Sequence, residues 1–478
     1  MRLLRTFGEL LSELMEKHAL TIAALAAALA LPNTNTVSRL LRDETSEKRR
    51  TDFVVNARMH PELFSPAEIE QLETAIIVSR LGKESYKAQK SIYNLIFDTP
   101  VEALPYHLPE AGCTLQEYFS RFSKREPLQI LCFNCCERDI FAALKPLFDE
   151  SDRIIEMNHY ISVNEDSRNY ALLIQTVSPL LMDHRYRLYT TTDRDNATDA
   201  LFFMPYAMLL KVGIGVGATE TLLLFHSDRT VRILYNMQRV SSYSNTQRMI
   251  AGIQPPPRPL YATKSGASMH SYRDFLFSCY QRERNRSIYQ IRLDPCFEMI
   301  PPEIVVRAFD TTVLSGEIMN PHSVESLIAI LQSRYHNLFQ KTKPTYLMLS
   351  LAATERFAHS GVMSDHFFGL RPFAREDVIA ILDSLLLAAR NNPRFHLHFL
   401  LDGLQMREYQ FVGIEQQSVL LCKSDTHYDL DNSYQEIVVD EPAFLKQYAD
   451  FYLHLLLPRH AHSEAHSIAL LQSIRDAL

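Results

Sequence analysis

The chain has 478 residues, of which 46% are hydrophobic and 22% charged, and it contains no low-complexity tract. This length is too great for one hydrophobic core, so we expect about two to four domains, and the composition excludes long disordered stretches. Seven cysteines, an odd number at irregular spacing, exclude a disulfide framework and favour a reducing compartment. We therefore expect a cytoplasmic protein.

Charge is distributed unevenly along the chain, whose net value is −7. Residues 1–60 carry nine Lys or Arg and seven Asp or Glu, whereas the remainder carries 40 and 49. A weakly basic N-terminal region on an acidic remainder is compatible with nucleic-acid binding through that region alone.

An apolar run at residues 19–31 is similar in composition to the core of a signal peptide. The residues before it contain Glu9, Glu13 and Glu16 and form a helical pattern of their own rather than a short basic segment. At 13 residues the run is also too short to span a bilayer. We therefore expect neither export nor membrane insertion.

Short helices with clear boundary signals fill the first eighty residues. Thr6 with Glu9 forms a capping-box pattern ahead of an amphipathic stretch. Residues 65–68 (SPAE) repeat that pattern with a proline at the first helical position. These signals predict an all-α domain over 1–80 followed by a helical connector over 81–126.

Within this domain, residues 21–42 predict two short helices joined by a break at 31–33. Small and apolar residues fill the first helix, the proline of the break ends it, and Asn33 caps the second. The second helix is expected to bury Val37, Leu40 and Leu41. Its outer face then presents Thr34, Asn35, Ser38, Arg39 and Arg42.

A polar face at the start of a short helix suits hydrogen bonding to base edges in the major groove of DNA. Cations just beyond it suit phosphate contacts, and Arg42, Lys48, Arg49 and Arg50 are the candidates for that role. The predicted DNA-binding residues are Asn33, Thr34, Asn35, Thr36, Ser38, Arg39, Arg42, Lys48, Arg49 and Arg50.

Over about residues 6–80 the chain resembles the helix-turn-helix domain of phage-repressor-like (XRE-type) regulators: a leading amphipathic helix, the two-helix motif, and two more helices. The string TVSR at 36–39 is also similar to the recognition helix common in LacI-type regulators. The resemblance implies that Thr34, Asn35 and Arg39 face bases.

Two departures from that pattern bear on the motif. Ala30 stands near the place where the turn usually carries a glycine, and the turn is one residue longer than the compact form. A plain helical bundle used for dimerisation therefore stays open as an alternative for residues 1–80.

From residue 128 the pattern changes to alternating strands and helices. Residues 128–133 predict a buried strand, 139–148 a helix and 153–163 a second strand, a unit that indicates an α/β or α+β body. Four prolines between residues 255 and 259 cannot lie inside a helix or a central strand. We therefore place a boundary there and predict α/β lobes over 127–254 and 260–478.

The two lobes share a pattern that suggests a diverged tandem repeat. In each, an apolar helix precedes a strand, at 171–181 and 186–190 in the first lobe and at 377–389 and 395–399 in the second. Each lobe also has a later strand ending in Ser-Asp, TLLLFHSD with Ser227-Asp228 and SVLLCKSD with Ser424-Asp425.

Several cysteine, glycine and histidine patterns have simpler interpretations than a metal or cofactor site. The CxxCC of Cys132, Cys135 and Cys136 has no second ligand pair and indicates buried small side chains, with a redox-sensing pair as the alternative. Glycines at 213, 215 and 217 precede a predicted strand rather than the helix that holds a pyrophosphate.

Histidines 396, 398, 460, 462 and 466, and the pair Asp429 and Asp431, lack the spacing of zinc or calcium sites. The sequence also shows no nucleotide-binding loop, zinc-protease motif or nucleophile elbow. We therefore expect no metal, no cofactor and no enzymatic activity.

Together these patterns favour a DNA-binding transcription regulator: a helix-turn-helix domain that binds double-stranded DNA as a homodimer, and a body that senses a small-molecule or peptide effector. The main alternative is an α/β enzyme or ligand-binding protein whose N-terminal helices serve for oligomerisation. A third is an adaptor whose lobes dock other proteins. Convergent acid, base or nucleophile groups in a pocket would indicate the enzyme, and an exposed apolar patch the adaptor.

Overall fold

The computed structural model divides the chain into two compact units, Met1–Ser91 (the head) and Ile92–Leu478 (the body). The residues that the structure describes are 5–97, 107–108, 113–114, 117, 128–133, 138–150, 154–162, 170–181, 183, 185–191, 200–204, 207–213, 219–225, 258–259, 261–266, 277–310, 321–340, 343–364, 372–406, 409–423 and 434–478.

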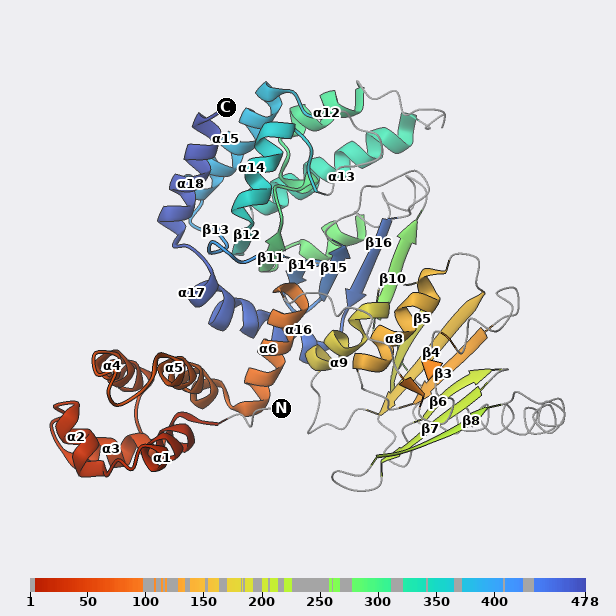
Figure 1. Cartoon of the computed structure of the whole chain (residues 1–478). Coiled ribbons are helices and arrows are strands. Elements are labelled where there is room, and N and C mark those ends of the chain that lie inside the picture. Colours follow the sequence, from red (N-terminus) through yellow and green to blue (C-terminus); the bar gives the residue numbers. More distant parts are fainter. Residues whose placement is uncertain are drawn as a thin grey trace. The chain divides into compact units, whose positions relative to one another are not determined.

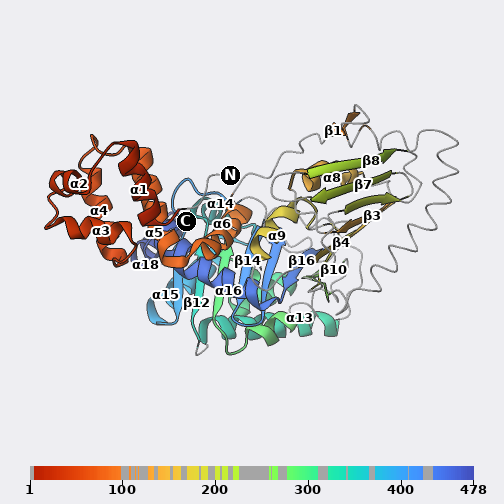
Figure 2. The same cartoon turned by 90° about the horizontal axis from the view of Figure 1, so that it is seen from below.

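The head is all-helical, as predicted (Figures 1 and 2). Thr6 and Ser65 both form the predicted capping boxes, with Glu9 and Glu68 as the reciprocal acids. Apolar side chains from five helices meet in one core that includes Phe7, Leu25, Val37, Phe53 and Ile76. The helices are α1 (Phe7–Lys17), α2 (Ile22–Ala28), α3 (Thr34–Leu41), α4 (Glu47–Arg58), α5 (Pro66–Leu81) and α6 (Lys83–Phe97), which continues into the body.

The turn between α2 and α3 differs from the expected one. α2 ends at Ala28, four residues before Pro32, and Ala30 adopts the left-handed conformation with a φ of 48°. Asn33 caps α3 as predicted, since its side chain accepts a hydrogen bond from Thr36 N at 3.0 Å. The left-handed residue, and not the proline, reverses the chain.

This backbone geometry gives a prediction about stability. Ala30→Gly should raise the stability of the head by about 0.5–1 kcal/mol, because an alanine side chain disfavours a positive φ that glycine adopts freely. Amide hydrogen exchange of the full chain, followed in peptides from residues 5–91, measures the change. Ala27→Gly, an exposed position inside α2, should have the opposite sign. Equal destabilisation by both substitutions would contradict the argument.

The body contains two mixed seven-stranded sheets with helices (Figure 1). The first has the order β8-β7-β6-β3-β4-β5-β9, with β3, β4 and β5 parallel and β6, β7, β8 and β9 joined antiparallel. Its strands are β3 (Leu128–Phe133), β4 (Ile155–Ser162), β5 (Tyr186–Thr191), β6 (Ala200–Met204), β7 (Ala207–Gly213), β8 (Thr219–Phe225) and β9 (Arg258–Pro259). The helices of this part of the chain are α8 (Arg138–Asp149), α9 (Tyr170–Val177) and η2 (Ser178–Leu180). A separate two-stranded sheet consists of β1 (His107–Leu108) and β2 (Cys113–Thr114).

The second sheet has the order β10-β16-β15-β14-β11-β12-β13, with β11, β12 and β13 parallel and the other neighbours antiparallel. Its strands are β10 (Tyr261–Gly266), β11 (Ile288–Arg292), β12 (Thr345–Leu349), β13 (Phe395–Phe399), β14 (Tyr409–Ile414), β15 (Ser418–Lys423) and β16 (Tyr434–Val439). Its helices are η3 (Phe297–Met299), α12 (Pro302–Asp310), α13 (Pro321–Gln340), α14 (Leu351–Ser360), α15 (Arg375–Asn391), α16 (Pro442–Phe451), η4 (Tyr452–Leu456), α17 (Leu457–His460) and α18 (Glu464–Asp476).

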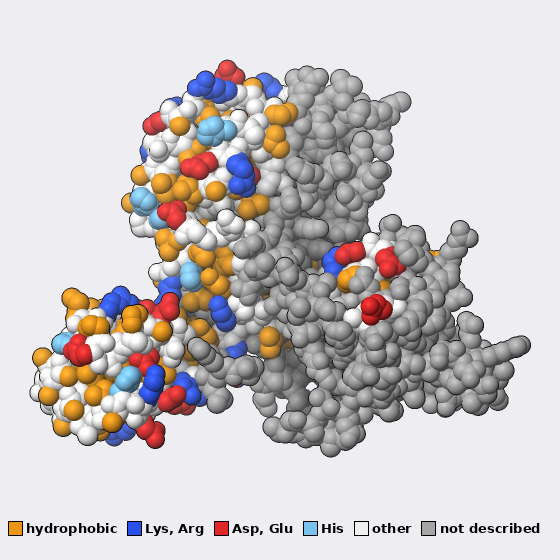
Figure 3. Space-filling view, in the orientation of Figure 1, with side chains coloured by type: hydrophobic (Ala, Val, Ile, Leu, Met, Phe, Trp, Pro, Cys, Tyr) orange, Lys and Arg blue, Asp and Glu red, His pale blue; other side chains and the backbone are white. Residues whose placement is uncertain are grey.

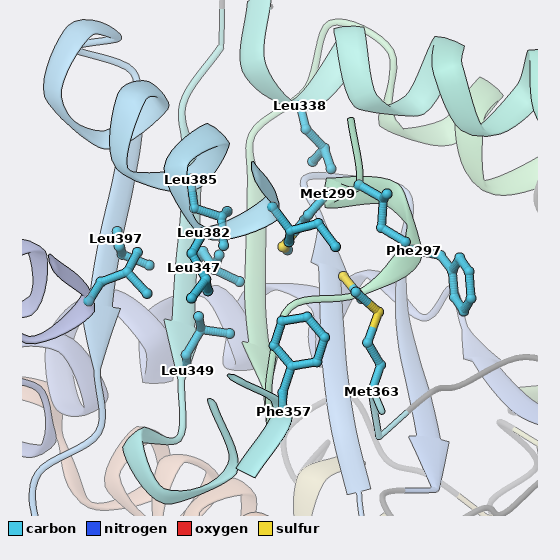
Figure 4. Packing of buried hydrophobic residues seen from close by; sticks show 14 of the residues in the cluster. Phe297, Met299, Leu338, Leu347, Leu349, Phe357, Met363, Leu382, Leu385 and Leu397 are labelled. Atoms are coloured by element: carbon cyan, nitrogen blue, oxygen red, sulfur yellow. The ribbon is translucent and has the colours of Figure 1, made fainter. Parts of the chain in front are cut away.

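A dense apolar core packs α15 against one face of the second sheet. Figure 4 shows Leu347, Leu349 and Leu397 from the strands pointing toward Leu382 and Leu385 of α15. All five side chains are fully buried. A helical N-terminal region followed by a body of mixed helices and sheets confirms the predicted multidomain layout at that level.

The chain leaves the first sheet at Pro259 and enters the second at Tyr261. β9 pairs with β5 at the edge of the first sheet, whereas β10 pairs with β16 in the second. An edge is the position that a proline tolerates in a sheet, because proline has no N–H to donate. The remaining residues of the proline-rich stretch lie outside the described part of the chain.

No helix among the described residues is both long enough and apolar enough to cross a membrane. The apolar run at 19–31, which contains α2, belongs to the core of the head instead.

Candidate nucleic-acid interface

Helix α3 is anchored through its inner face, as predicted. Val37 and Leu40 are fully buried in the core of the head, and Leu41 packs against that core while half-buried. At its carboxyl end α3 is crossed closely by α1: a Cβ on Gly8 would lie 2.3 Å from the Leu41 carbonyl oxygen. Glycine is therefore required at this crossing.

The outer face of α3 carries the polar side chains that the sequence pattern predicts. Asn33, Thr34, Asn35, Arg39 and Arg42 are exposed. The Arg39 guanidinium donates a hydrogen bond to the Glu44 carbonyl oxygen at 3.2 Å. Arg42 donates to the Ser38 carbonyl oxygen and lies 3.4 Å from the Glu44 carboxylate.

Two of the predicted DNA-binding residues are partly withdrawn from the surface. Thr36 and Ser38 are half-buried. The Thr36 hydroxyl donates to the Asn33 side chain at 3.2 Å, and the Ser38 hydroxyl to the Thr34 carbonyl at 3.3 Å. Both hydroxyls therefore form hydrogen bonds within the first turns of α3 and its cap, and neither is fully exposed.

Two cations lie free in the first turn of α4. Lys48 and Arg49 are exposed, and neither side chain has an ion-pair partner among the described residues. Most other cations of the head are paired with acids, such as Arg58 with Glu73 at 2.6 Å and Lys83 with Glu9 at 2.9 Å. Figure 3 shows cations and acids interspersed on one face of the head. Lys48 and Arg49 are thus available for contacts at the start of the helix that follows α3.

The expectation that Arg50 joins this exposed cationic group is wrong. Arg50 is buried, and its guanidinium donates to the Asp43 carbonyl oxygen at 2.8 Å. Ser46 caps α4, and Arg50 falls on the inner face of that helix together with Phe53 and Ala57. That helical spacing is the signal that could have placed Arg50 correctly.

Asp43, a residue that the sequence analysis did not single out, connects three helices of the head. Its carboxylate accepts hydrogen bonds from Gly8 N at 3.2 Å and from the Ser79 hydroxyl at 2.9 Å. It also lies 3.5 Å from Arg50. Because Asp43 directly follows α3 with a φ of 56°, these contacts fix where α3 ends.

Glu68, a buried acid in the first turn of α5, contacts residues at the end of α1. Burial acts to raise the pKa of Glu68, but hydrogen bonds from Lys17, the Ser65 backbone and His18 lower it to about 2. Lys17 Nζ lies 2.6 Å and His18 Nε2 2.9 Å from Glu68 Oε1. The ionised carboxylate therefore ties α1 to the start of α5.

The body has a pocket of about 510 Å³ between the β14–β15 hairpin and α16. Tyr289 and Tyr448 contribute aromatic surface, and Gly413 leaves room for the Tyr448 ring, which a Cβ there would approach to 2.4 Å. A hydrogen bond from Ser287 lowers the pKa of the Glu415 carboxyl group at the rim. This volume lies within the range of small-molecule sites. The other charged lining residues are Asp440 and Lys446.

Four buried charges form a network beside β11. Arg334 donates to Glu283 at 2.5 and 3.0 Å and to Glu298 at 3.2 Å. Arg292 donates to Glu298 at 3.1 Å. Burial acts to raise the pKa of Glu298, but Arg334 and Arg292 lower it to about 2. Each charge is thus compensated inside the body.

The histidines between residues 396 and 466 form contacts with other residues of the body. His396 lies 3.4 Å from Glu464, and the His398 ring is hydrogen-bonded to the His462 carbonyl at 3.1 Å. The His462 and His466 rings lie 4.8 Å apart. Within the described residues, no three His, Cys, Asp or Glu side chains are grouped so as to hold a metal ion.

The cysteine and glycine patterns are only partly described. Cys132 is fully buried on β3. Gly213 ends β7, and the strand expected after the glycine-rich segment is β8, paired with β7. Cys135, Cys136, Gly215, Gly217, Asp429, Asp431 and both Ser-Asp pairs lie outside the described residues.

Comparisons with known proteins identify no family. No family model and no curated protein sequence matches the chain. Two solved structures are similar over much of its length: a phosphatidylserine synthase from Haemophilus influenzae, at 9% identity and a TM-score of 0.25, covering 83% of this chain and 98% of that one; and a polyphosphate kinase from Porphyromonas gingivalis, at 11% identity and a TM-score of 0.21, covering 88% and 66%. Likenesses of this size support no inference about activity.

Proposed function

We propose that the protein is a DNA-binding transcription regulator whose head contacts the major groove through α3. The observation that carries this proposal is the two-sided character of α3. Val37 and Leu40 anchor it, while Asn35, Arg39 and Arg42 are presented outward. Asn and Arg are the side chains that make bidentate contacts with adenine and guanine edges.

Charge around α3 supports the same proposal. Lys48 and Arg49 begin the next helix without acidic partners among the described residues, and Arg42 is only loosely paired with Glu44 at 3.4 Å. Three exposed cations on and just after a polar helix face suit phosphate contacts that position the helix. A head of this size reads few base pairs, so we propose that it acts as a homodimer on a two-fold symmetric site.

The body, in this proposal, is the regulatory part. The pocket beside α16, with tyrosines in its lining and charged groups at its rim, is our candidate for the effector site. We also infer that the two lobes are a tandem repeat, because β3–β8 and β11–β16 follow the same strand order and directions. By strand order β8 corresponds to β16, and not to β15 as the Ser-Asp match suggests.

A salt titration tests DNA binding by the head. Two heads with three phosphate-binding cations each should release about six counterions, so the logarithm of the association constant should fall with the logarithm of salt concentration with a slope of about −5. Fluorescence anisotropy of the full chain on a duplex selected from a random pool measures it. Absence of binding to any duplex at low salt would contradict the proposal.

A further inference from the structure

The outward face of α4 carries the largest exposed apolar side chains of the head. Val55 is 57% and Met59 76% exposed; Val55 lies on α4, and Met59, one turn later, is its C-cap residue. No other large apolar side chain among the described head residues is so exposed. Asp52, three residues before Val55, is exposed and has no partner among the described residues, and Arg58, three residues after Val55, is 58% exposed.

The arrangement of these charges fits a second copy of the same surface. When two identical helices meet across a two-fold axis at right angles to them, they run antiparallel, and positions equally distant from the axis face each other. An axis at Val55 places Val55 against its own copy and Asp52 opposite Arg58 of the second copy, twice. Thr51 then lies opposite Met59 of the second copy. The face is thus complementary to itself in both charge and apolar character.

We propose that α4 is the surface through which two heads associate, antiparallel and centred on Val55. Arg58 keeps its contact with Glu73, at 2.6 Å from one nitrogen, because a guanidinium has further donors for the facing Asp52. The purpose of the contact, pairing two α3 helices on one DNA site, rests on the proposed function. The association itself is independent of DNA.

Charge reversal tests the pairing in the full chain without DNA. Each of the variants Asp52→Arg and Arg58→Asp has like charges facing each other at both contacts. Sedimentation equilibrium should therefore show that each variant self-associates at least tenfold more weakly than the wild type. An equimolar mixture restores both opposite-charge contacts and should recover association. Glu70→Arg, an exposed reversal on α5, should leave association unchanged. Wild-type association of either single variant would overturn the proposal.

A crosslink locates the contact even if the body associates by itself. Val55→Cys places two thiols face to face at the two-fold axis, where mild oxidation should give a disulfide-linked dimer in high yield. The wild type, oxidised alongside, gives the background from the native cysteines, and Glu70→Cys is the matched control. A yield for Val55→Cys no higher than these two would overturn the proposal. Because no DNA is present, failure to bind DNA is a separate result.

Discussion

Replacing Arg39 by alanine is expected to weaken binding to a specific duplex by about 1–3 kcal/mol while changing the affinity for random DNA little. The physical reason is that Arg39 is exposed one turn beyond Asn35 on the outer face of α3, where a long side chain reaches base edges. Loss of a base contact removes discrimination between sequences but leaves the phosphate contacts in place.

Arg49→Ala should behave differently on the same two duplexes. Arg49, in the first turn of α4, has no ion-pair partner among the described residues. Its loss should therefore weaken binding to specific and random DNA equally and reduce the magnitude of the salt slope by about one per head. Lys87→Ala, which removes a cation on α6 that pairs with Glu84, is the control and should change neither quantity. An unchanged ratio of specific to random affinity in Arg39→Ala would show that α3 is not a recognition helix.

In the body, Arg334→Met is expected to lower the free energy of unfolding by about 3–5 kcal/mol. The substitution leaves Glu283, which is fully buried, as a carboxylate without a cation, and it removes one of the two cations beside Glu298. The free energy lost by burying a charge without a partner is far larger than the free energy that the ion pair contributes to stability.

The double variant Arg334→Met with Glu283→Leu separates this effect from simple loss of packing. Removing both charges should recover most of the stability, since apolar side chains of similar volume replace a buried ion pair at little cost. Urea unfolding of the full chain, followed by far-UV circular dichroism, measures both variants. If the double variant is as unstable as Arg334→Met, the uncompensated charge is not the cause.

Local signals in the sequence predicted much of the head correctly. Both capping boxes, the Asn33 cap and the burial of Val37 and Leu40 follow from spacing within one helix turn. The end of α2 was predicted at the wrong residue because proline is a strong signal. The position of Ala30, near the place where the turn usually carries a glycine, was the local signal for the left-handed conformation that it adopts. The role of Asp43, by contrast, depends on residues 35 and 36 positions away.

The candidate interface was predicted less completely than the helices that carry it. Arg39, Arg42, Lys48 and Arg49 are exposed, as predicted. Arg50 is buried, because residues 48–50 lie at the start of α4, whereas the prediction places them beyond a helix. In the body, the strand–helix–strand unit at β3, α8 and β4 was predicted. The order of strands within each sheet was not, since it depends on pairing between distant segments.

The pairing of β10 with β16 has a consequence for how the protein is made. Tyr261 lies opposite Val439, 178 positions later in the chain, so β10 leaves the ribosome well before its partner strand. The head is a compact unit of residues 1–91, so it can fold while the rest is still being synthesised. The second sheet cannot close until β16 has been synthesised. Until then the edge of β10 that pairs with β16 is also exposed, and unpaired strand edges of this kind promote aggregation of nascent chains.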